Sequence, residues 1–396
     1  MPQLANEFKC TGCAACVNSC NYHAITMHAD SEGFMMPVID KNKCVECKLC
    51  EKTCPVISLR TNENAITPKT YAMWSNPDRI VSSSGGAFSA FARVVFAKGG
   101  VVFGAALDQN LICKHMEAHN LEELVPIRGS KYVQSEIGDT FCKVKECLKQ
   151  NKWVLYTGTP CQIAGLYSFL RKPYDKLVTL DLACHGVPSN KIFQAYLQKL
   201  KNYRSDFIGL DGYEFRKRDG WGKAPFIKVG SNLKPIYDTA ALYMCAFDRA
   251  AIFRNCCYDC QYAKMPRIGD CSIADFWGLG RYGVPFKHNV LKGVSLVFAN
   301  NEKGVSLILE MKDVFIEERT LEEALIENHN LNFPSKRDSL RDEIIKAFLD
   351  ENKTLSDIDK EFNIVDHTLK SRIKKYASKF HLFDFVKSIY NFYKVH

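Results

Sequence analysis

Several features of secreted, membrane-embedded and disordered proteins are missing from this sequence. Residues 1–8 carry no basic segment leading into an apolar core, so we expect no secretory signal. The longest apolar tract, residues 87–107, is interrupted by Arg93, Lys98 and two glycines, and it cannot span a bilayer as a helix. Low-complexity tracts are absent, and 46% of the 396 residues are hydrophobic, which excludes wholesale disorder. We therefore expect a cytoplasmic globular protein of two or three domains.

Cysteine, by contrast, is abundant, with 18 residues. Without export these thiols stay reduced, because disulfides belong to oxidising compartments, and the pattern indicates metal binding or redox chemistry. The N-terminal cysteines form two groups with the same spacing of two, two and three intervening residues. They are Cys10, Cys13, Cys16 and Cys20, followed by Cys44, Cys47, Cys50 and Cys54.

This repeat makes residues 1–60 resemble the bacterial two-cluster ferredoxins. Three thiolates from a tight loop wrap one face of a [4Fe-4S] cluster, and the fourth cysteine of each group reaches the other cluster. We therefore expect Cys54 to complete the first group and Cys20 to complete the second. Zinc is the alternative, but zinc sites pair two CxxC units rather than three consecutive cysteines and a fourth. Asn21 replaces the usual proline, at a position that is not a ligand.

Acidic residues are fewer than basic ones: 44 Asp and Glu stand against 53 Lys and Arg, which gives a formal net charge of +9. The excess is modest, and clusters with four thiolates usually carry negative charge that offsets it. No nucleic-acid binding is expected from this balance.

Beyond the cysteine repeat the sequence predicts an α/β central domain with a mostly parallel sheet, because strand and helix patterns alternate. Expected strands cover 100–107, 153–156, 177–182 and 293–298, and expected helices cover 88–98, 142–151, 161–171, 189–201 and 303–312. Pro160 and Pro188 stand where each could be the first residue of a helix. The expected boundaries are 1–60 for a small α+β ferredoxin-like domain, 61–70 for a linker, 71–330 for the central domain and 331–396 for a helical segment.

Three loops in the central domain have the composition of ligand-binding turns. Residues 82–88 are small and lead into a helix, whose N-terminal amides favour anions. Residues 128–135 combine a glycine turn with a cation and an aromatic ring. Residues 156–165 run from a strand into a helix, which is where ligands bind in open α/β sheets. Ordinary caps and turns are the alternative reading for each loop.

Together with two further motifs, these loops resemble the family of coenzyme F420 hydrogenase/dehydrogenase β subunits. The matching segments are SSSGGAFSA at 82–90, GSKYVQ at 129–134, TGTPCQIAG at 157–165, CHGVP at 184–188 and DFWG at 275–278. The resemblance implies FAD, [4Fe-4S] clusters and electron transfer between clusters, flavin and a hydride-type acceptor. It implies the cofactor better than the substrate, because relatives differ in what they reduce.

The resemblance also implies a set of site residues. The residues expected to bind FAD are Ser83, Ser84, Gly85, Gly86, Lys131, Tyr132, Thr157, Gly158 and Thr159. Lys131 is expected at the flavin phosphate or N1, or else in solvent. His185 is expected as a proton donor near the flavin, or else as a histidine that satisfies a loop carbonyl. The aromatic residues of DFWG are expected in the core.

A third [4Fe-4S] cluster is implied at Cys161, Cys184, Cys257 and Cys260. Cys256 competes with Cys257, and we prefer Cys257 because it restores the CxxC spacing. Ordinary core thiols are the alternative for Cys161 and Cys184. The remaining cysteines have no partner at ligand spacing and are expected as buried thiols: Cys113, Cys142, Cys147, Cys245 and Cys271.

The function predicted is therefore that of an iron-sulfur flavoprotein oxidoreductase. It would relay electrons between ferredoxin-type clusters and FAD, exchange two electrons with an F420-like or other organic acceptor, and work with a redox partner protein. The alternatives are a non-catalytic electron-transfer subunit and a zinc-stabilised nucleic-acid-binding protein. Residues 367–396 are basic with interleaved aromatics, so they either contact a membrane or partner peripherally or pack on their own domain.

Overall fold

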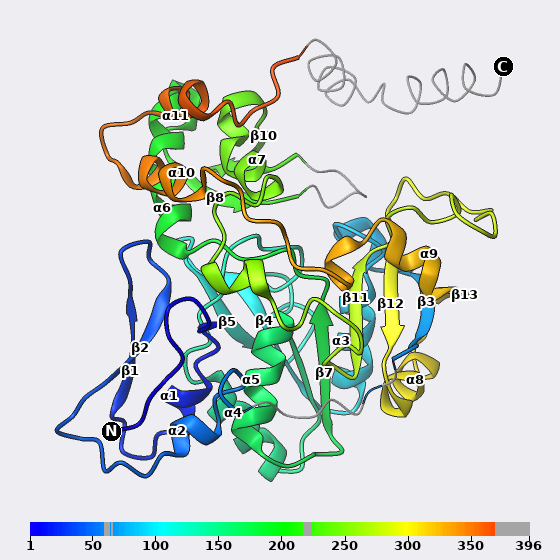
Figure 1. Cartoon of the computed structure of the whole chain (residues 1–396). Coiled ribbons are helices and arrows are strands. Elements are labelled where there is room, and N and C mark those ends of the chain that lie inside the picture. Colours follow the sequence, from blue (N-terminus) through cyan, green and yellow to red (C-terminus); the bar gives the residue numbers. More distant parts are fainter. Residues whose placement is uncertain (59–63, 65, 217–223, 369–396) are drawn as a thin grey trace.

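The two cysteine groups lie in a small α+β part at the N-terminus (Figure 1). The computed structural model describes residues 1–58, 64, 66–216 and 224–368. This first part consists of α1 (Ala15–Ser19), β1 (Ile25–Ala29), β2 (Met35–Ile39) and α2 (Leu49–Lys52), with β1 and β2 antiparallel. The sequence repeat is also a backbone repeat, because Ala14 and Lys48, which precede α1 and α2, share a φ of 56° and a ψ of 16°.

A mixed eight-stranded sheet forms the centre of the molecule. Its order is β13-β3-β12-β11-β7-β6-β4-β5, and only the neighbours among β11, β7, β6 and β4 are parallel. The strands are β3 (Lys69–Ser75), β4 (Val101–Leu107), β5 (Cys113–Ala118), β6 (Val154–Gly158), β7 (Leu177–Leu182), β11 (Cys271–Asp275), β12 (Ser295–Ala299) and β13 (Val314–Arg319).

The α/β class is confirmed, but the expectation of a mostly parallel sheet is wrong. Four of the neighbouring pairs are antiparallel: β4 with β5, β11 with β12, β12 with β3, and β3 with β13. β5 follows β4 through the short turn at Asp108–Ile112, and a turn of that length reverses the chain and makes an antiparallel pair. β3 begins at Lys69, inside the stretch expected as a linker.

Helices cover both faces of the sheet, and the alternation of side chains along each strand assigns them. In β4, Val102 packs in the core beneath α3 (Ala87–Ala97) and α8 (Glu302–Leu309), whereas Phe103 packs in the opposite core. That second core is closed by α4 (Thr140–Lys149) and α5 (Pro160–Leu170). Cys13, Ala14 and Ala15 are buried in it as well, so the N-terminal part shares its core with the central sheet.

Pro160 and Pro188 occupy different positions relative to the helices that follow them, α5 and α6 (Asn190–Tyr203). Pro160 is the first residue of α5, as predicted, and follows the N-cap Thr159. Pro188 is not a first helical residue, because Ser189 is the N-cap of α6 and accepts the Ile192 amide. A hydroxyl at that position satisfies an otherwise unpaired helix donor, so the helix begins there.

A second lobe, drawn above the N-terminal part in Figure 1, has its own aromatic core. Phe193, Tyr196, Tyr243, Phe348 and Ile358 meet there. The lobe contains α6, the antiparallel sheet β10-β9-β8, α7, α10 and α11, and α9 lies beside β3. Their bounds are β8 (Leu210–Glu214), β9 (Phe226–Val229), β10 (Asn232–Pro235), α7 (Leu242–Asp248), α9 (Leu321–Ile326), α10 (Arg341–Leu349) and α11 (Leu355–Phe362).

The C-terminal segment expected as helical is described only in its first half. Within residues 331–368 the structure has α10 and α11, which pack on α6 in the core of the second lobe. The basic aromatic stretch falls almost wholly in 369–396, outside the described residues, so its role and the expected domain boundaries stay predictions.

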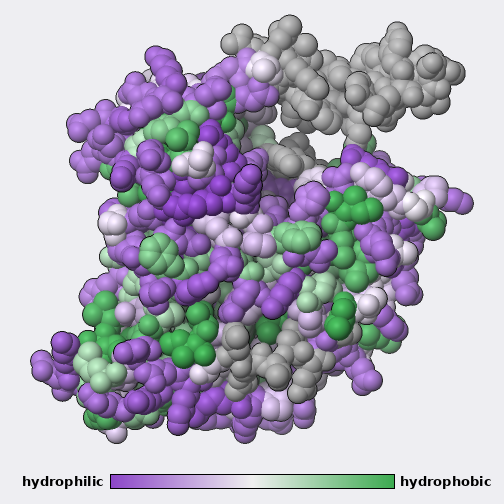
Figure 2. Space-filling view, viewed as in Figure 1, coloured by the Kyte–Doolittle hydropathy of each residue, from purple (hydrophilic) through white to green (hydrophobic). Residues whose placement is uncertain are grey.

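No helix in the described part of the chain is long and apolar enough to cross a membrane. Figure 2 shows one face of the molecule covered mostly by hydrophilic residues, with the hydrophobic ones in separate small groups.

Candidate cluster and cofactor sites

The first cysteine group meets Cys54, as the crossed arrangement predicts. Cys10, Cys13, Cys16 and Cys54 line one cavity with Pro37 and Val56. Burial raises the pKa of the Cys13 thiol to about 12, and the charges of Cys10 and Cys54 contribute to this rise. Burial and the same neighbours also raise the pKa of Cys16. Thiols that hinder one another's ionisation need a positive charge among them to bind as thiolates, and an iron cluster supplies it.

The second group is nearer the surface. Cys47 is exposed and Cys50 is buried, and burial, followed by the charges of Glu51 and Cys47, raises the pKa of Cys50. The Sγ of Cys20 accepts the Ala24 amide at 3.3 Å, and α1 packs against α2. Among the described residues, no three His, Cys, Asp or Glu side chains are grouped as they would be around a single metal ion.

A third group of cysteines borders a separate cavity of about 100 Å³. Burial raises the pKa of Cys184 to about 12, and the charges of Cys260 and Cys256 act in the same direction. Burial, Cys260, Cys184 and Cys256 likewise raise the pKa of Cys161. Cys257 also borders the cavity, but it packs against the aromatic core of the second lobe. Of these two adjacent cysteines, Cys256 is the one whose charge raises the pKa of Cys161, Cys184 and Cys260.

The strand-to-helix turn before α5 explains most of the segment TGTPCQ. Gly158 has no room for a side chain, since a Cβ there would lie 2.9 Å from Gln162 Oε1. The Thr159 amide donates to that same oxygen at 3.0 Å, which closes a capping box around Pro160 and Cys161. The turn thus holds Thr157 and Thr159 at the carboxyl end of β6 and points Cys161 towards the third cavity.

A large cavity, of about 320 Å³, lies at this same edge of the sheet. This volume falls in the range of small-molecule sites. All the residues expected to hold FAD border it except Gly85: Ser83, Ser84, Gly86, Lys131, Tyr132, Thr157, Gly158 and Thr159. His185, Asp275 and Trp277 border it too, so four distant loops and the DFWG segment converge on one site.

Comparisons with known proteins agree with this arrangement. Residues 9–57 match the model of the 4Fe-4S dicluster domain, and residues 151–324 match that of the C terminus of the coenzyme F420 hydrogenase/dehydrogenase β subunit. Residues 151–324 thus belong to the C-terminal domain of the coenzyme F420 hydrogenase/dehydrogenase β subunits. Both resemblances inferred from the sequence are confirmed, and the N-terminal part is an iron-sulfur module.

One curated relative is the F subunit of the F420H2 dehydrogenase of Methanosarcina mazei, 22% identical over 299 residues, which cover 70% of this chain and 80% of that protein. A solved relative is a chain of the F420-reducing [NiFe] hydrogenase complex from Methanosarcina barkeri. It is 18% identical with a TM-score of 0.45, and the match covers 74% of this chain and 93% of that one. This likeness is too low for positions to be carried over.

Two of the residues expected to bind FAD make contacts with the surrounding structure that the sequence did not reveal. Gly85 lies against the sheet, where a Cβ would be 2.2 Å from the Met73 carbonyl oxygen, and its amide donates to Ser295 Oγ. The Lys131 ammonium donates to the carbonyls of Pro126, Ile127 and Arg128 at 2.7–2.8 Å. Lys131 therefore shapes the 126–131 loop at the cavity edge.

Several residues around the cavity were missed because they are far apart in the sequence. Arg216 and Asp275 form a buried ion pair of 2.5 Å at the wall. Asp275 and Trp277 belong to the DFWG segment, of which only Phe276 is wholly in the core as expected. Phe276 directly follows β11 and is buried, whereas Asp275 and Trp277 on either side of it border the cavity.

A buried polar network in the wall of the cavity was also missed. His115 Nε2 donates to the Thr157 carbonyl at 3.0 Å, so the Nδ1 of the neutral ring accepts from Ser135 Oγ at 2.8 Å, and Gln162 donates to Ser135. Burial lowers the pKa of His115 to about 4, so the imidazole is neutral at physiological pH.

Of the cysteines expected as buried thiols, Cys113 and Cys271 are buried, Cys147 and Cys245 are partly buried, and Cys142 is exposed. The expectation is wrong for Cys142. It lies on the first turn of α4, where its neighbour Phe141 takes the core position.

Proposed function

We propose that this chain is an iron-sulfur flavoprotein subunit that carries electrons between [4Fe-4S] clusters and FAD. In this proposal two clusters are held by the crossed N-terminal cysteines and a third by Cys161, Cys184, Cys256 and Cys260. FAD occupies the 320 Å³ cavity and exchanges two electrons with an F420-like or other organic acceptor. Cys256 replaces Cys257 from the sequence-based prediction.

The observation that carries the proposal is a shared wall. Thr159, Cys184, His185, Gly186 and Val187 border both the third cysteine cavity and the large cavity. A cluster held by Cys184 would therefore stand directly beside a ligand in the large cavity. Electron exchange between a one-electron carrier and a two-electron carrier needs such proximity.

The residues of the large cavity fit a flavin dinucleotide. Helix α3 begins beside it with Gly86 as N-cap, and that position has no side chain to cap the first amides. Those amides, with Ser83, Ser84 and the Arg128–Lys131 loop, would hold the phosphates. Among the described residues Asp275 Oδ1 has no hydrogen-bond partner although it is buried, and an N–H donor such as that of the flavin ring would satisfy it.

His185 is the proposed proton donor because it is exposed and borders both cavities. Its backbone carbonyl accepts Ser335 Oγ at 2.5 Å, which ties the CHGVP turn to the segment before α10. An imidazole at this position can give or take a proton near neutral pH, as a two-electron reduction requires.

A protein partner is part of the proposal. The Methanosarcina mazei relative is by name one subunit of F420H2 dehydrogenase, which supports a multi-subunit setting for this chain as well. The non-catalytic electron-transfer subunit remains the alternative, and it is distinguished by turnover of the isolated chain with an organic acceptor. The dicluster match replaces the zinc alternative.

The test compares two variants at one cavity position. Ser130 borders the cavity beside Lys131, so Ser130→Glu would place a negative charge against the flavin phosphates, whereas Ser130→Gln adds similar bulk without charge. Anaerobically purified wild-type protein should contain FAD and about twelve iron atoms. Ser130→Glu should bind FAD at least about tenfold more weakly, equal to about 1.4 kcal/mol, and Ser130→Gln clearly less so.

Iron content controls for misfolding, because neither variant touches a cysteine. If both variants bind FAD as tightly as the wild type, the flavin does not lie in this cavity. A wild-type protein without flavin but with full iron would leave the alternative of a pure electron-transfer subunit.

A further inference from the structure

Arg254 is a buried cation placed between two of the cysteine cavities. Its side chain is 1% exposed, and its backbone immediately precedes the turn that carries Cys256 and Cys260. The guanidinium extends back to the N-terminal module, where Nε donates to the Cys10 carbonyl at 2.7 Å. One side chain therefore connects the first cluster loop with the third cysteine cavity.

Within the described residues, the other hydrogen-bond and ring partners of this guanidinium are neutral. They are Gln134 Oε1, the Met35 carbonyl, Met36 Sδ and the face of the Phe34 ring. Within the described ranges Arg254 has no carboxylate at ion-pair distance, whereas the equally buried Arg267 has one and Arg341 has two. A buried charge without a counter-ion is costly, so its compensation has to come from other anions nearby.

In the proposed function those anions are the cysteine thiolates of two cluster sites. Arg254 stands two residues before Cys256, a proposed ligand of the third cluster, and its Nε donates to the carbonyl of Cys10, a ligand of the first. On the other side, the loop between Cys10 and Cys13 closes directly on the guanidinium. A Cβ on Gly12 would lie 2.8 Å from Arg254 Nη1, so the loop has no side chain at that contact.

We propose that Arg254 sets the reduction potentials of the cluster held by Cys10, Cys13, Cys16 and Cys54 and of the third cluster. The second half of this statement rests on the proposed function. Each added electron makes a cluster more negative, and a fixed buried cation stabilises the reduced form. Because the guanidinium lies between both sites, it raises both potentials. Arg254 thus acts on the clusters through its charge.

The test is a redox titration of the full-length protein with its clusters, followed by electron paramagnetic resonance. Arg254→Gln keeps hydrogen-bonding capacity but removes the charge, and Arg254→Lys keeps the charge. We expect Arg254→Gln to disfavour reduction at least tenfold, which is about 59 mV more negative for one electron. Arg254→Lys should stay near the wild type. The control is the double variant Arg341→Met with Glu32→Gln. It removes an ion pair without changing the net charge and should not shift the potentials.

Iron content separates this inference from the proposed function. About eight iron atoms in the wild type would overturn the third site, and the first cluster would still test Arg254. Wild-type potentials in a fully loaded Arg254→Gln variant would overturn the inference. If that variant loses its clusters, Arg254→Lys decides, because wild-type iron content and potentials in it support a role of charge, and a loss equal to that of Arg254→Gln overturns it.

Discussion

Cys256 and Cys257 are neighbours in sequence with different surroundings. The Cys256 charge acts on Cys161, Cys184 and Cys260, whereas Cys257 packs against the aromatic core. The CxxC spacing favours Cys257, but the 3-10 turn over Asn255–Asp259 carries both cysteines, and it is Cys256 whose charge reaches the other three sulfurs. Spacing in sequence predicts a ligand only when the backbone of the turn is known.

The adjacent cysteines make a matched pair of variants. Cys256→Ser should lose about four of about twelve iron atoms, because one of the proposed thiolate ligands of the third cluster is gone. Cys257→Ser should keep all of them, since it changes a packing residue. Iron analysis and the electron paramagnetic resonance signal of the reduced protein measure both. Loss of iron in Cys257→Ser alone would instead make Cys257 the ligand.

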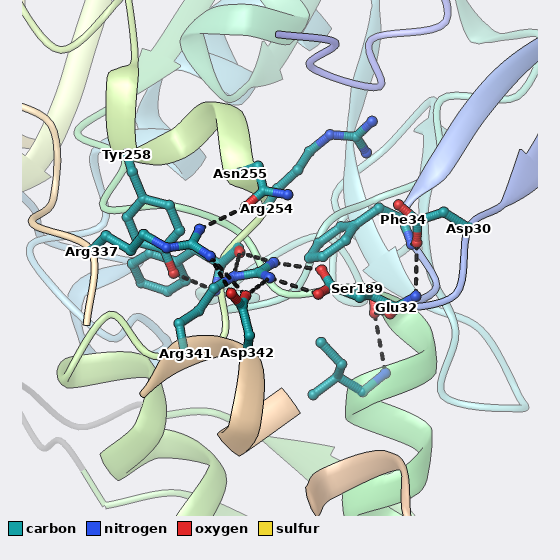
Figure 3. Close-up of polar contacts among 12 residues, drawn as sticks. Asp30, Glu32, Phe34, Ser189, Arg254, Asn255, Tyr258, Arg337, Arg341 and Asp342 are labelled. Carbon is teal, nitrogen blue, oxygen red and sulfur yellow. Dashed lines mark hydrogen bonds and ion pairs between the residues drawn. The ribbon is translucent and has the colours of Figure 1, made fainter. Parts of the chain in front are cut away.

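At the scale of elements, the tip of the β1–β2 hairpin is held against the second lobe. Arg341 of α10 donates to both Glu32 oxygens at 2.6 Å and to the Phe253 carbonyl, as Figure 3 shows for the Glu32 contact. Ser189 Oγ donates to the Glu32 carbonyl at 2.6 Å. The N-terminal module is thus bound to α6 and α10, and Arg254 lies alongside in the same junction (Figure 3).

Removing one partner of this pair should cost more than removing both. Arg341 is 1% exposed and Glu32 25%, so Arg341→Met leaves a partly buried carboxylate uncompensated. We expect a loss towards the lower end of roughly 3–5 kcal/mol in the free energy of unfolding. Arg341→Met with Glu32→Gln should lose clearly less. Denaturant titration of the loaded protein gives all values, and strictly additive losses would show that the pair is not coupled.

The contacts at this junction determine what deletion of the N-terminal module would do to the rest of the protein. Cys13, Ala14 and Ala15 are buried in the core of the central sheet, and Arg254 bonds to the Cys10 and Met35 carbonyls. Deleting the first 60 residues would expose that core and take hydrogen-bond partners from two buried arginines. Point variants therefore separate the module from the flavin site better than deletion does.

For the whole molecule, the buried His115 links folding to pH. Its pKa is lowered from 6.5 to about 4, mainly by burial. Between these pH values the unfolded chain binds a proton at this histidine and the folded chain does not. Its contribution to stability is complete above pH 6.5 and is lost as the pH falls towards 4. At pH 5 the loss amounts to about 2 kcal/mol.

His115→Gln should flatten the fall in the free energy of unfolding between pH 7 and 5. His119, four residues further on and exposed, gives the control, because His119→Gln should leave the pH dependence as in the wild type. Denaturant titrations across this pH range measure the slope. An unchanged slope in His115→Gln would mean that another group links the folding of this protein to pH.

The sequence alone determined the parts of this protein whose chemistry is local. The repeated spacing of Cys10–Cys20 and Cys44–Cys54 specifies tight loops and ligand types, and residues 9–57 match a 4Fe-4S dicluster domain. Strand and helix patterns placed β4, β6, β7 and α3–α6 close to their observed bounds, because hydrophobic periodicity follows local geometry.

Only the tertiary structure decided which distant groups meet. The direction of the outer strands depends on connections and pairing partners rather than on periodicity, so the mixed sheet could not be predicted. The structure underlies the proposal of Cys256 in place of Cys257, shows the Lys131 ammonium bonded to loop carbonyls, and places Asp275 in the cavity wall. Arg254 illustrates the reason, since the cost of a buried charge depends on every group around it, and those groups come from separate segments.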